Sequence, residues 1–155
     1  MAYSFRQFLK GSGAELDRVL NRDIFLYFLD LEVKRSRRYQ NFFSILIVRL
    51  QELSDQGNGK GLETCYQRLS NLIKQEIRDS DILGALGEKK LAVLLPYADM
   101  SAGGYTRSRF ESSLKYYDFN REGYQVVVEQ VSFPGDGTDT PDLIRKLVEP
   151  EAANS

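Results

Sequence analysis

The sequence predicts one α/β (α+β) domain in which helices surround a mixed β-sheet. The chain has 155 residues, which is the size of a single domain. Segments of helical periodicity alternate along it with short β-branched runs, and two of these runs adjoin as a hairpin. With 42% apolar and 28% charged residues, the composition is that of a globular protein that can bury a core.

The first half of the chain is predicted to form a helix, a buried strand and a second helix. The segment 22–39 lacks proline and glycine, and its apolar residues recur at helical spacing, at Ile24, Phe25, Phe28, Leu29 and Val33. The run Phe42–Leu50 is apolar on both faces, as in a central strand. After a glycine-rich loop at 54–61, apolar residues at intervals of three and four mark a helix to about Ile77. Cys65 lies on that apolar face, so we expect it to be buried rather than reactive.

The second half is predicted to form a hairpin, a helix, a strand and a short last helix. Asp81–Leu86 and Leu91–Leu95 are apolar runs joined by a turn that begins with Gly87. After the hairpin we predict a helix at 100–117, although Gly103 and Gly104 weaken its start. A strand at Tyr124–Phe133 and a turn at 134–137 follow. Pro141 then opens a short last helix at Asp142–Val148.

The composition excludes several classes of function. The absence of histidine excludes Ser-His-Asp and Cys-His catalysis and most zinc sites. Cys65 is the only cysteine, which rules out an internal disulfide and fits a reducing compartment. A formal charge of −1 argues against general nucleic-acid binding. Residues 1–13 lack a secretory signal pattern, and Arg49 interrupts the longest apolar stretch, so we expect a cytoplasmic protein without membrane insertion.

A basic run ends the first predicted helix, with Lys34, Arg35, Arg37 and Arg38. Cations at this end complement the helix dipole, so the favoured interpretation is a solvated last turn. An anion-binding patch is the alternative.

The hairpin residues 80–96, with the sequence SDILGALGEKKLAVLLP, resemble without gaps the core of GGDEF domains. In that family a Ser-Asp pair leads through a strand into Gly-Gly-Asp/Glu-Glu-Phe, followed by an apolar strand ending in Leu-Leu-Pro. Further matches lie at Asn21-Arg22, Phe25, the run 35–39, the strand 44–50, the turn 133–137 and Leu143-Ile144. The resemblance implies a GGDEF-like domain at 15–148, preceded by a helix or linker at 1–14 and followed by a disordered tail at 149–155.

The resemblance also implies a nucleotidyl-cyclase-like fold, with a mixed, mainly antiparallel central sheet surrounded by helices. Active members of the family condense two GTP molecules into cyclic di-GMP, using divalent cations that carboxylates hold. This chain departs from the pattern within the signature itself. Gly87 matches, but the positions after it hold Glu88, Lys89, Lys90 and Leu91.

The first predicted strand departs as well, since Arg49 and Gln51 align with the family's acidic residues there. Glu63 is a partial match to the guanine-reading aspartate, after a loop that is shorter than the family's. Like charges about 4 Å apart repel by roughly 1–4 kcal/mol per pair, so cations in place of carboxylates oppose magnesium binding. We therefore expect a protein that is not an enzyme, with no catalytic residues, no bound metal and no cofactor.

The same cations have two further interpretations. Lys89, Lys90 and Arg49 could bind a phosphate directly, in place of the metal ions. Charged hairpin tips commonly face solvent without any ligand, and we favour that simpler interpretation.

An Arg-x-x-Asp element runs from Arg78 to Asp81, with five residues between it and Gly87. In GGDEF domains this spacing marks an inhibitory site for cyclic di-GMP, away from the catalytic pocket. A guanidinium can donate two parallel hydrogen bonds to guanine or phosphate, and a carboxylate can accept from the guanine edge. The family adds an arginine from the following helix, which corresponds to Arg109, whereas Arg107 lies on another face of that helix. The resemblance therefore implies a receptor for cyclic di-GMP. Such a receptor can act as a homodimer or together with a partner protein.

Two other functions remain open. Asp81 could serve only as a cap for nearby backbone amides and Arg78 only in a surface ion pair, which leaves a scaffold for docking or dimerisation without nucleotide. Exposed tyrosines at 105, 116 and 117 would favour such an interface, although we expect them to pack half-buried on the sheet. A regulatory GTP site in the former catalytic pocket is disfavoured by the lost metal ligands and the shorter loop.

Overall fold

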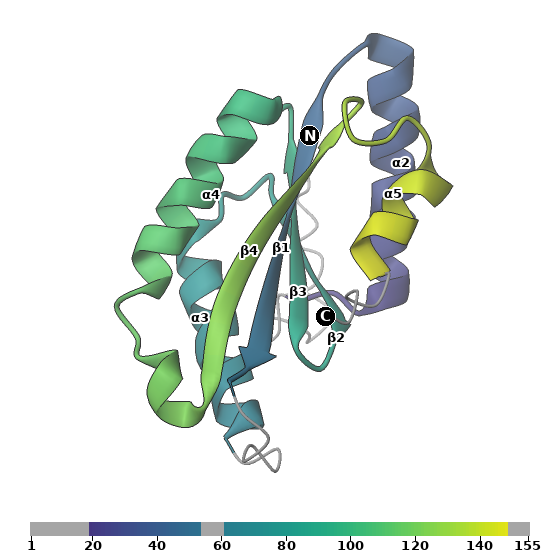
Figure 1. Ribbon diagram of the computed structural model, residues 1–155. Helices are drawn as coiled ribbons and strands as arrows, with labels where there is room; N and C mark the ends of the chain where they lie inside the picture. Colours follow the sequence, from purple (N-terminus) through teal and green to yellow (C-terminus); the bar gives the residue numbers. More distant parts are fainter. Residues whose placement is uncertain (1–18, 54–60, 149–155) are drawn as a thin grey trace.

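The computed structural model describes residues 19–53 and 61–148, and Figure 1 shows how their elements are arranged. In chain order these are α2 (Arg22–Tyr39), β1 (Phe43–Glu52), α3 (Leu62–Glu76), β2 (Ile82–Gly87), β3 (Lys90–Pro96), α4 (Met100–Leu114), the 3₁₀ helix η1 (Phe119–Glu122), β4 (Tyr124–Phe133) and α5 (Thr140–Val148). The four strands form one sheet in the order β2-β3-β1-β4, and each neighbouring pair is antiparallel. The predicted fold class and the mainly antiparallel character of the sheet are confirmed.

The sheet separates two layers of helices (Figure 1). α2 and α5 lie against one face, and α3 and α4 lie against the other. Successive side chains of a strand point to opposite faces, so β1 contributes to both cores. Leu46 and Val48 face α3 and α4, whereas Ile45 and Ile47 face α2 and α5, and all four are buried. The prediction of a central strand that is buried on both faces is confirmed.

Two of the helices that flank the sheet, α2 and α4, begin at side-chain caps. Asn21 caps α2 and Asp99 caps α4, and each carboxyl or amide oxygen accepts a hydrogen bond from the backbone N–H three residues on, at 2.9 and 2.8 Å. These bonds satisfy N–H groups that the helix itself leaves without partners. The helix predicted at 100–117 is too long, because α4 ends at Leu114 and the chain then turns into η1.

The predicted hairpin is formed by β2 and β3, with a register shift between Ala85 and Gly87. α2 packs onto β2 at Gly84, where a Cβ atom would lie 2.5 Å from Cδ1 of the buried Phe25. The missing side chain of Gly84 thus permits this close approach of helix and strand.

Two predicted segments lie outside the described residues, namely the helix or linker at 1–14 and the tail at 149–155. The same holds for 54–60 of the predicted loop. Among the described residues, no helix combines the length and the apolar character that crossing a membrane requires.

Candidate functional site

A cavity of about 760 Å³ lies between the α3–β2 connection, the end of β3 and one side of α4. Arg78, Asp81 and Arg109 all line it. These three residues come from two separate parts of the sequence, and the fold brings them to one site. Tyr97 from the residues after β3 and Tyr105 from α4 also line the cavity. Its volume falls within the range that small-molecule sites usually occupy.

A tight turn positions the Arg-x-x-Asp element, whose Arg78 and Asp81 line this cavity. The Arg78 backbone N–H donates to Oδ2 of Asp81 at 2.8 Å, and the Asp81 backbone N–H donates to the Arg78 carbonyl at 3.0 Å. Asp81 therefore has the structural role that its residue type predicts, as an acceptor for a nearby backbone amide. Arg78 is exposed, so its side chain can reach a bound molecule while its backbone holds the turn.

Arg109 joins α4 to the end of α3 through Glu76. Its Nε donates to Oε1 of Glu76 at 3.1 Å, and its Nη2 donates to the Glu76 backbone carbonyl at 2.9 Å. Ser113 donates to the other carboxylate oxygen at 2.8 Å. Because Glu76 is the last residue of α3, its carbonyl has no partner within the helix, and Arg109 supplies one. A guanidinium carries five N–H donors, so the tether leaves Arg109 with donors for a ligand.

Arg107 is a contrasting arginine on the same helix. It pairs with Glu111 at 3.5 Å and does not line the cavity. Its side chain is 41% exposed, close to the 43% of Arg109. The two arginines therefore differ in position rather than in exposure.

The altered signature residues lie elsewhere, and each contacts an acceptor within the protein. Lys89 Nζ lies 2.7 Å from Oε1 of Glu52, and this hydrogen bond is the main cause that raises the pKa of Lys89. Lys90 Nζ donates to the Leu147 carbonyl at 3.1 Å, near the end of α5. These lysines are thus tied to neighbouring elements, which corrects the expectation of a hairpin tip that only faces solvent.

Arg49 has an acceptor of its own, Oε1 of Glu129 on β4, at 3.2 Å from its Nε. The three cations thus meet three different acceptors instead of converging on one anion. They also do not suit the divalent cations that the family uses, because such ions require oxygen ligands. In the described part of the chain, no group of three or more potential metal-ligating side chains is found.

Two further residues were compared with the family in the sequence, and a third was expected to be buried. Gln51 and Glu63 are both exposed, on β1 and at the start of α3. Cys65 is fully buried as predicted, and burial raises the pKa of its thiol.

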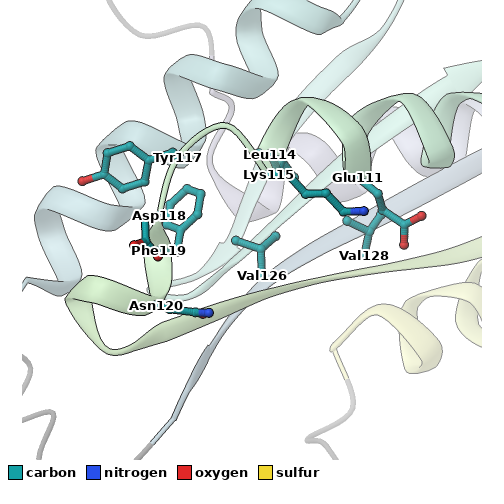
Figure 2. A pocket seen from close by; sticks show the side chains of 9 residues that line it. All are labelled: Glu111, Leu114, Lys115, Tyr117, Asp118, Phe119, Asn120, Val126 and Val128. Atoms are coloured by element: carbon teal, nitrogen blue, oxygen red, sulfur yellow. The ribbon is translucent and has the colours of Figure 1, made fainter.

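A second cavity, of about 540 Å³, lies between the C-terminal part of α4, η1 and β4 (Figure 2). Val126 and Val128 form its floor beside Leu114, and the charged Glu111 and Lys115 lie at its rim. None of the predicted site residues lines this second cavity.

The three tyrosines of the interface hypothesis differ in exposure. Tyr105 is 83% exposed and Tyr116 is 91% exposed, so the expectation that they pack half-buried is wrong. Tyr105 lies on α4, and Tyr116 lies two residues after its end. Tyr117 packs against the core as expected, and its ring meets Phe119 edge-on at 4.7 Å.

In the basic run at the end of α2, Lys34, Arg37 and Arg38 are exposed, as expected for a solvated last turn, whereas Arg35 is half-buried. Arg35 lies over the ring of Tyr97, 4.6 Å from its centroid, and its Nη2 lies 2.5 Å from Oε2 of Glu32. Arg37 donates to the Thr138 carbonyl at 2.7 Å. The contact with Tyr97 was not predicted, although the order Pro96-Tyr97 after a strand signals a turn that exposes an aromatic ring.

The comparisons with known proteins agree with this architecture. The chain matches the family model described as diguanylate cyclase, GGDEF domain, over residues 15–144. No match is found among curated proteins.

Solved structures of GGDEF domains share the fold. A DGC protein from Thermotoga maritima is 18% identical with a TM-score of 0.69, over 84% of this chain and 96% of that one. The GGDEF domain of YfiN (TpbB) from Pseudomonas aeruginosa is 16% identical with a TM-score of 0.72, over 83% and 85%. That of DgcB from Caulobacter crescentus, in complex with c-di-GMP, is 12% identical with a TM-score of 0.68, over 83% and 78%. On the family match, which extends over most of its length, this chain belongs to the GGDEF-domain family.

Proposed function

We propose that this GGDEF domain is a catalytically inactive receptor that binds cyclic di-GMP in the cavity beside α4. The observation that carries the proposal is that Arg78, Asp81 and Arg109 line one cavity. They are the three residues that the family's inhibitory-site pattern selects from the sequence. A related GGDEF domain from Caulobacter crescentus is described in complex with c-di-GMP, which makes this ligand the first to test.

The chemistry of the cavity suits a guanine nucleotide. Two arginines and one aspartate are the charged residues that line it. An arginine donates to O6 and N7 of guanine or to a phosphate, and an aspartate accepts from the guanine N1–H and exocyclic amine. Cyclic di-GMP offers both bases and phosphates, so one molecule can engage Arg78 and Asp81 with a base and Arg109 with a phosphate.

The proposal of inactivity is supported by the residues at the former metal positions. Arg49, Lys89 and Lys90 are cations there, and each already contacts an acceptor in the protein. Divalent metal ions that carry a triphosphate need carboxylate or other oxygen ligands instead.

Isothermal titration calorimetry with cyclic di-GMP tests the receptor proposal. The wild type is expected to bind, and Arg78→Ala is expected to weaken binding by about 5- to 150-fold, the effect of losing one bidentate arginine contact. Arg109→Ala should weaken binding similarly. Arg107→Ala is the matched control, because Arg107 is equally exposed on the same helix but outside the cavity.

Two results would contradict the receptor proposal: no binding by the wild type, or an Arg78→Ala variant that binds like the wild type. Thermal melting of each variant shows whether a loss of binding reflects unfolding. Catalytic inactivity is tested separately, by incubating the protein with GTP and magnesium and analysing the products by chromatography. Formation of cyclic di-GMP would refute that part of the proposal.

A protein-interaction scaffold is the second candidate, and one observation favours it. α2 exposes an apolar stripe at helical spacing, formed by Ile24, Tyr27 and Leu31. Aromatic side chains are enriched at protein interfaces. If calorimetry shows no nucleotide binding, analytical ultracentrifugation of the wild type and Tyr27→Ser tests whether this stripe mediates self-association.

A further inference from the structure

Tyr97 occupies a backbone position that usually belongs to glycine. Its φ of 64° is in the left-handed region, which bulky residues rarely adopt. The Ala98 N–H donates to the Leu95 carbonyl across this turn, at 3.4 Å, and Pro96 holds the second position. In turns that have proline at the second position and a positive φ at the third, glycine is the common residue at the third position. A tyrosine here carries a conformational cost that its side chain must offset.

The ring of Tyr97 is supported from behind by α2. The Arg35 guanidinium lies over one face of the ring and also donates a hydrogen bond to the phenol oxygen. Arg35 is held in turn by the buried Glu32, whose Oε2 also accepts from Ser36 at 3.2 Å. This chain of contacts fixes the orientation of the ring, so little entropy is lost when a ligand rests on it.

Tyr97 is accessible from the cavity. Tyr97 lines the cavity, whereas Arg35, whose guanidinium lies 4.6 Å from the ring centroid, does not. The side chain remains 63% exposed. A cation next to an aromatic ring draws electron density from that ring, which favours stacking of an electron-rich heterocycle.

The polar groups of the cavity complement this flat surface. Arg78 and Asp81 can bind the edge of a base through hydrogen bonds, and an aromatic face can bind its plane. A purine is oriented by contacts to both its edge and its plane. The Arg-x-x-Asp element supplies contacts to the edge only.

We propose that Tyr97 is the base-stacking residue of this cavity, positioned by Arg35 and Glu32 so that a guanine of the ligand rests on its ring. This inference rests on the proposed receptor function and adds to it a residue outside the Arg-x-x-Asp pattern. Purine ligands should therefore be preferred over pyrimidine analogues of the same charge.

Substitution of Tyr97 by glycine and by leucine separates stacking from structure. Tyr97→Gly removes the ring and also relieves the positive φ, so thermal stability should be equal to or above that of the wild type. Its affinity for cyclic di-GMP should nevertheless fall about 5- to 100-fold, as for the loss of one base-stacking contact. Tyr97→Leu keeps the apolar volume without the aromatic face and should show a similar loss. Tyr116→Leu is the control, since Tyr116 is exposed outside the cavity.

A fluorescent variant gives a direct signal for contact with the base. The chain has no tryptophan, so Tyr97→Trp introduces a single indole, whose emission can be excited selectively over that of the tyrosines. Stacking of guanine on its indole should quench the emission as cyclic di-GMP is added, whereas cyclic di-UMP should quench it little.

The outcomes distinguish this inference from the receptor proposal. If the wild type does not bind cyclic di-GMP, both fail. If the wild type binds, Arg78→Ala binds more weakly, and Tyr97→Gly and Tyr97→Leu bind like the wild type, the receptor proposal stands and the stacking role of Tyr97 is overturned. A loss of stability in Tyr97→Gly with unchanged affinity would show instead that the ring only links α2 to β3.

Discussion

Gly103 in α4 lies where the helix closely approaches the sheet, and replacing it by alanine tests that packing. A Cβ at this position would lie 2.6 Å from both Nε2 of Gln130 and Oγ of Ser44, and 2.8 Å from Cβ of Ser44. Ser44 is fully buried, and its hydroxyl contacts the carbonyls of Ala98 and Asp99 and the hydroxyl of Ser132 at 2.9–3.2 Å. These neighbours cannot yield without breaking hydrogen bonds between α4 and the sheet.

The two opposing effects of Gly103→Ala can be compared in magnitude. Alanine is preferred over glycine within a helix by about 1 kcal/mol. Overpacking a tight contact costs about 1–3 kcal/mol, and disturbing the hydrogen bonds of Ser44 costs about 1 kcal/mol more. The net loss should be about 1–3 kcal/mol, which lowers the melting temperature of a domain this size by roughly 2–12 °C.

Gly104→Ala provides the matched control one residue further along the same helix. The nearest atom to its Cβ would be Oε1 of Gln130 at 3.8 Å, which is ordinary van der Waals contact. Only the helix preference remains, so this variant should gain up to about 1 kcal/mol and melt roughly 2–4 °C higher. Urea denaturation and thermal melting of both variants measure the difference. If Gly103→Ala proved as stable as Gly104→Ala, the close approach of α4 to Ser44 would be refuted.

Three further predictions follow from the site and the hairpin. Asp81→Ala should lower the free energy of unfolding by about 1–2 kcal/mol in urea titrations as well as weaken ligand binding, because Asp81 accepts from the Arg78 N–H; a variant as stable as the wild type would contradict this. The hydrogen bond to Glu52 raises the pKa of Lys89 above its usual 10.5. The difference in unfolding free energy between the wild type and Lys89→Met should therefore be constant from pH 7 to 9 and become smaller as the pH rises beyond 10.5. A difference that grows above pH 10.5 would contradict this prediction. Cys65 should react with a thiol reagent only after denaturation, since it is buried and its pKa is raised by desolvation; rapid labelling of the native protein would disprove its burial.

The order of elements could be predicted from the sequence because periodicity reports burial directly. The strand at Tyr124–Phe133 was predicted with the bounds that the structure gives, and the hairpin and α2 closely match. The end of α4 was misplaced, because apolar spacing continues to Tyr117 while the backbone has already left the helix at Leu114. Spacing alone does not distinguish a helix from a turn that returns its aromatic residue to the same core.

Exposure of single side chains was harder to predict than the elements themselves. Tyr105 and Tyr116 were expected to be half-buried because tyrosine usually packs its ring. Whether a helix residue reaches the sheet depends on the rotation of α4 about its axis, and in this structure Gly103 is turned toward Ser44. That contact joins residues far apart in the sequence and leaves no local signal.

For the candidate site, the sequence was enough to select the residues but not the groups with which they form hydrogen bonds. The spacing from Gly87 selected Arg78, Asp81 and Arg109, which line one cavity. The tether of Arg109 to Glu76 depends on where α3 ends relative to α4, a tertiary relationship. Tyr97 was missed because the pattern that selected the arginines contains no aromatic position.

The two regions of the molecule use their cations in opposite ways. At the hairpin, Lys89 binds Glu52 and Lys90 binds the α5 carbonyl of Leu147. Both ammonium groups thus hold neighbouring elements together. At the cavity, Arg109 also joins two helices, yet a planar guanidinium that makes two bonds still presents donors, whereas an ammonium group is a compact point charge without a fixed fork. The arginine side chain can therefore support the fold and a ligand at the same time. This difference in donor geometry is the physical reason to seek ligand binding at Arg78 and Arg109 rather than at the altered signature.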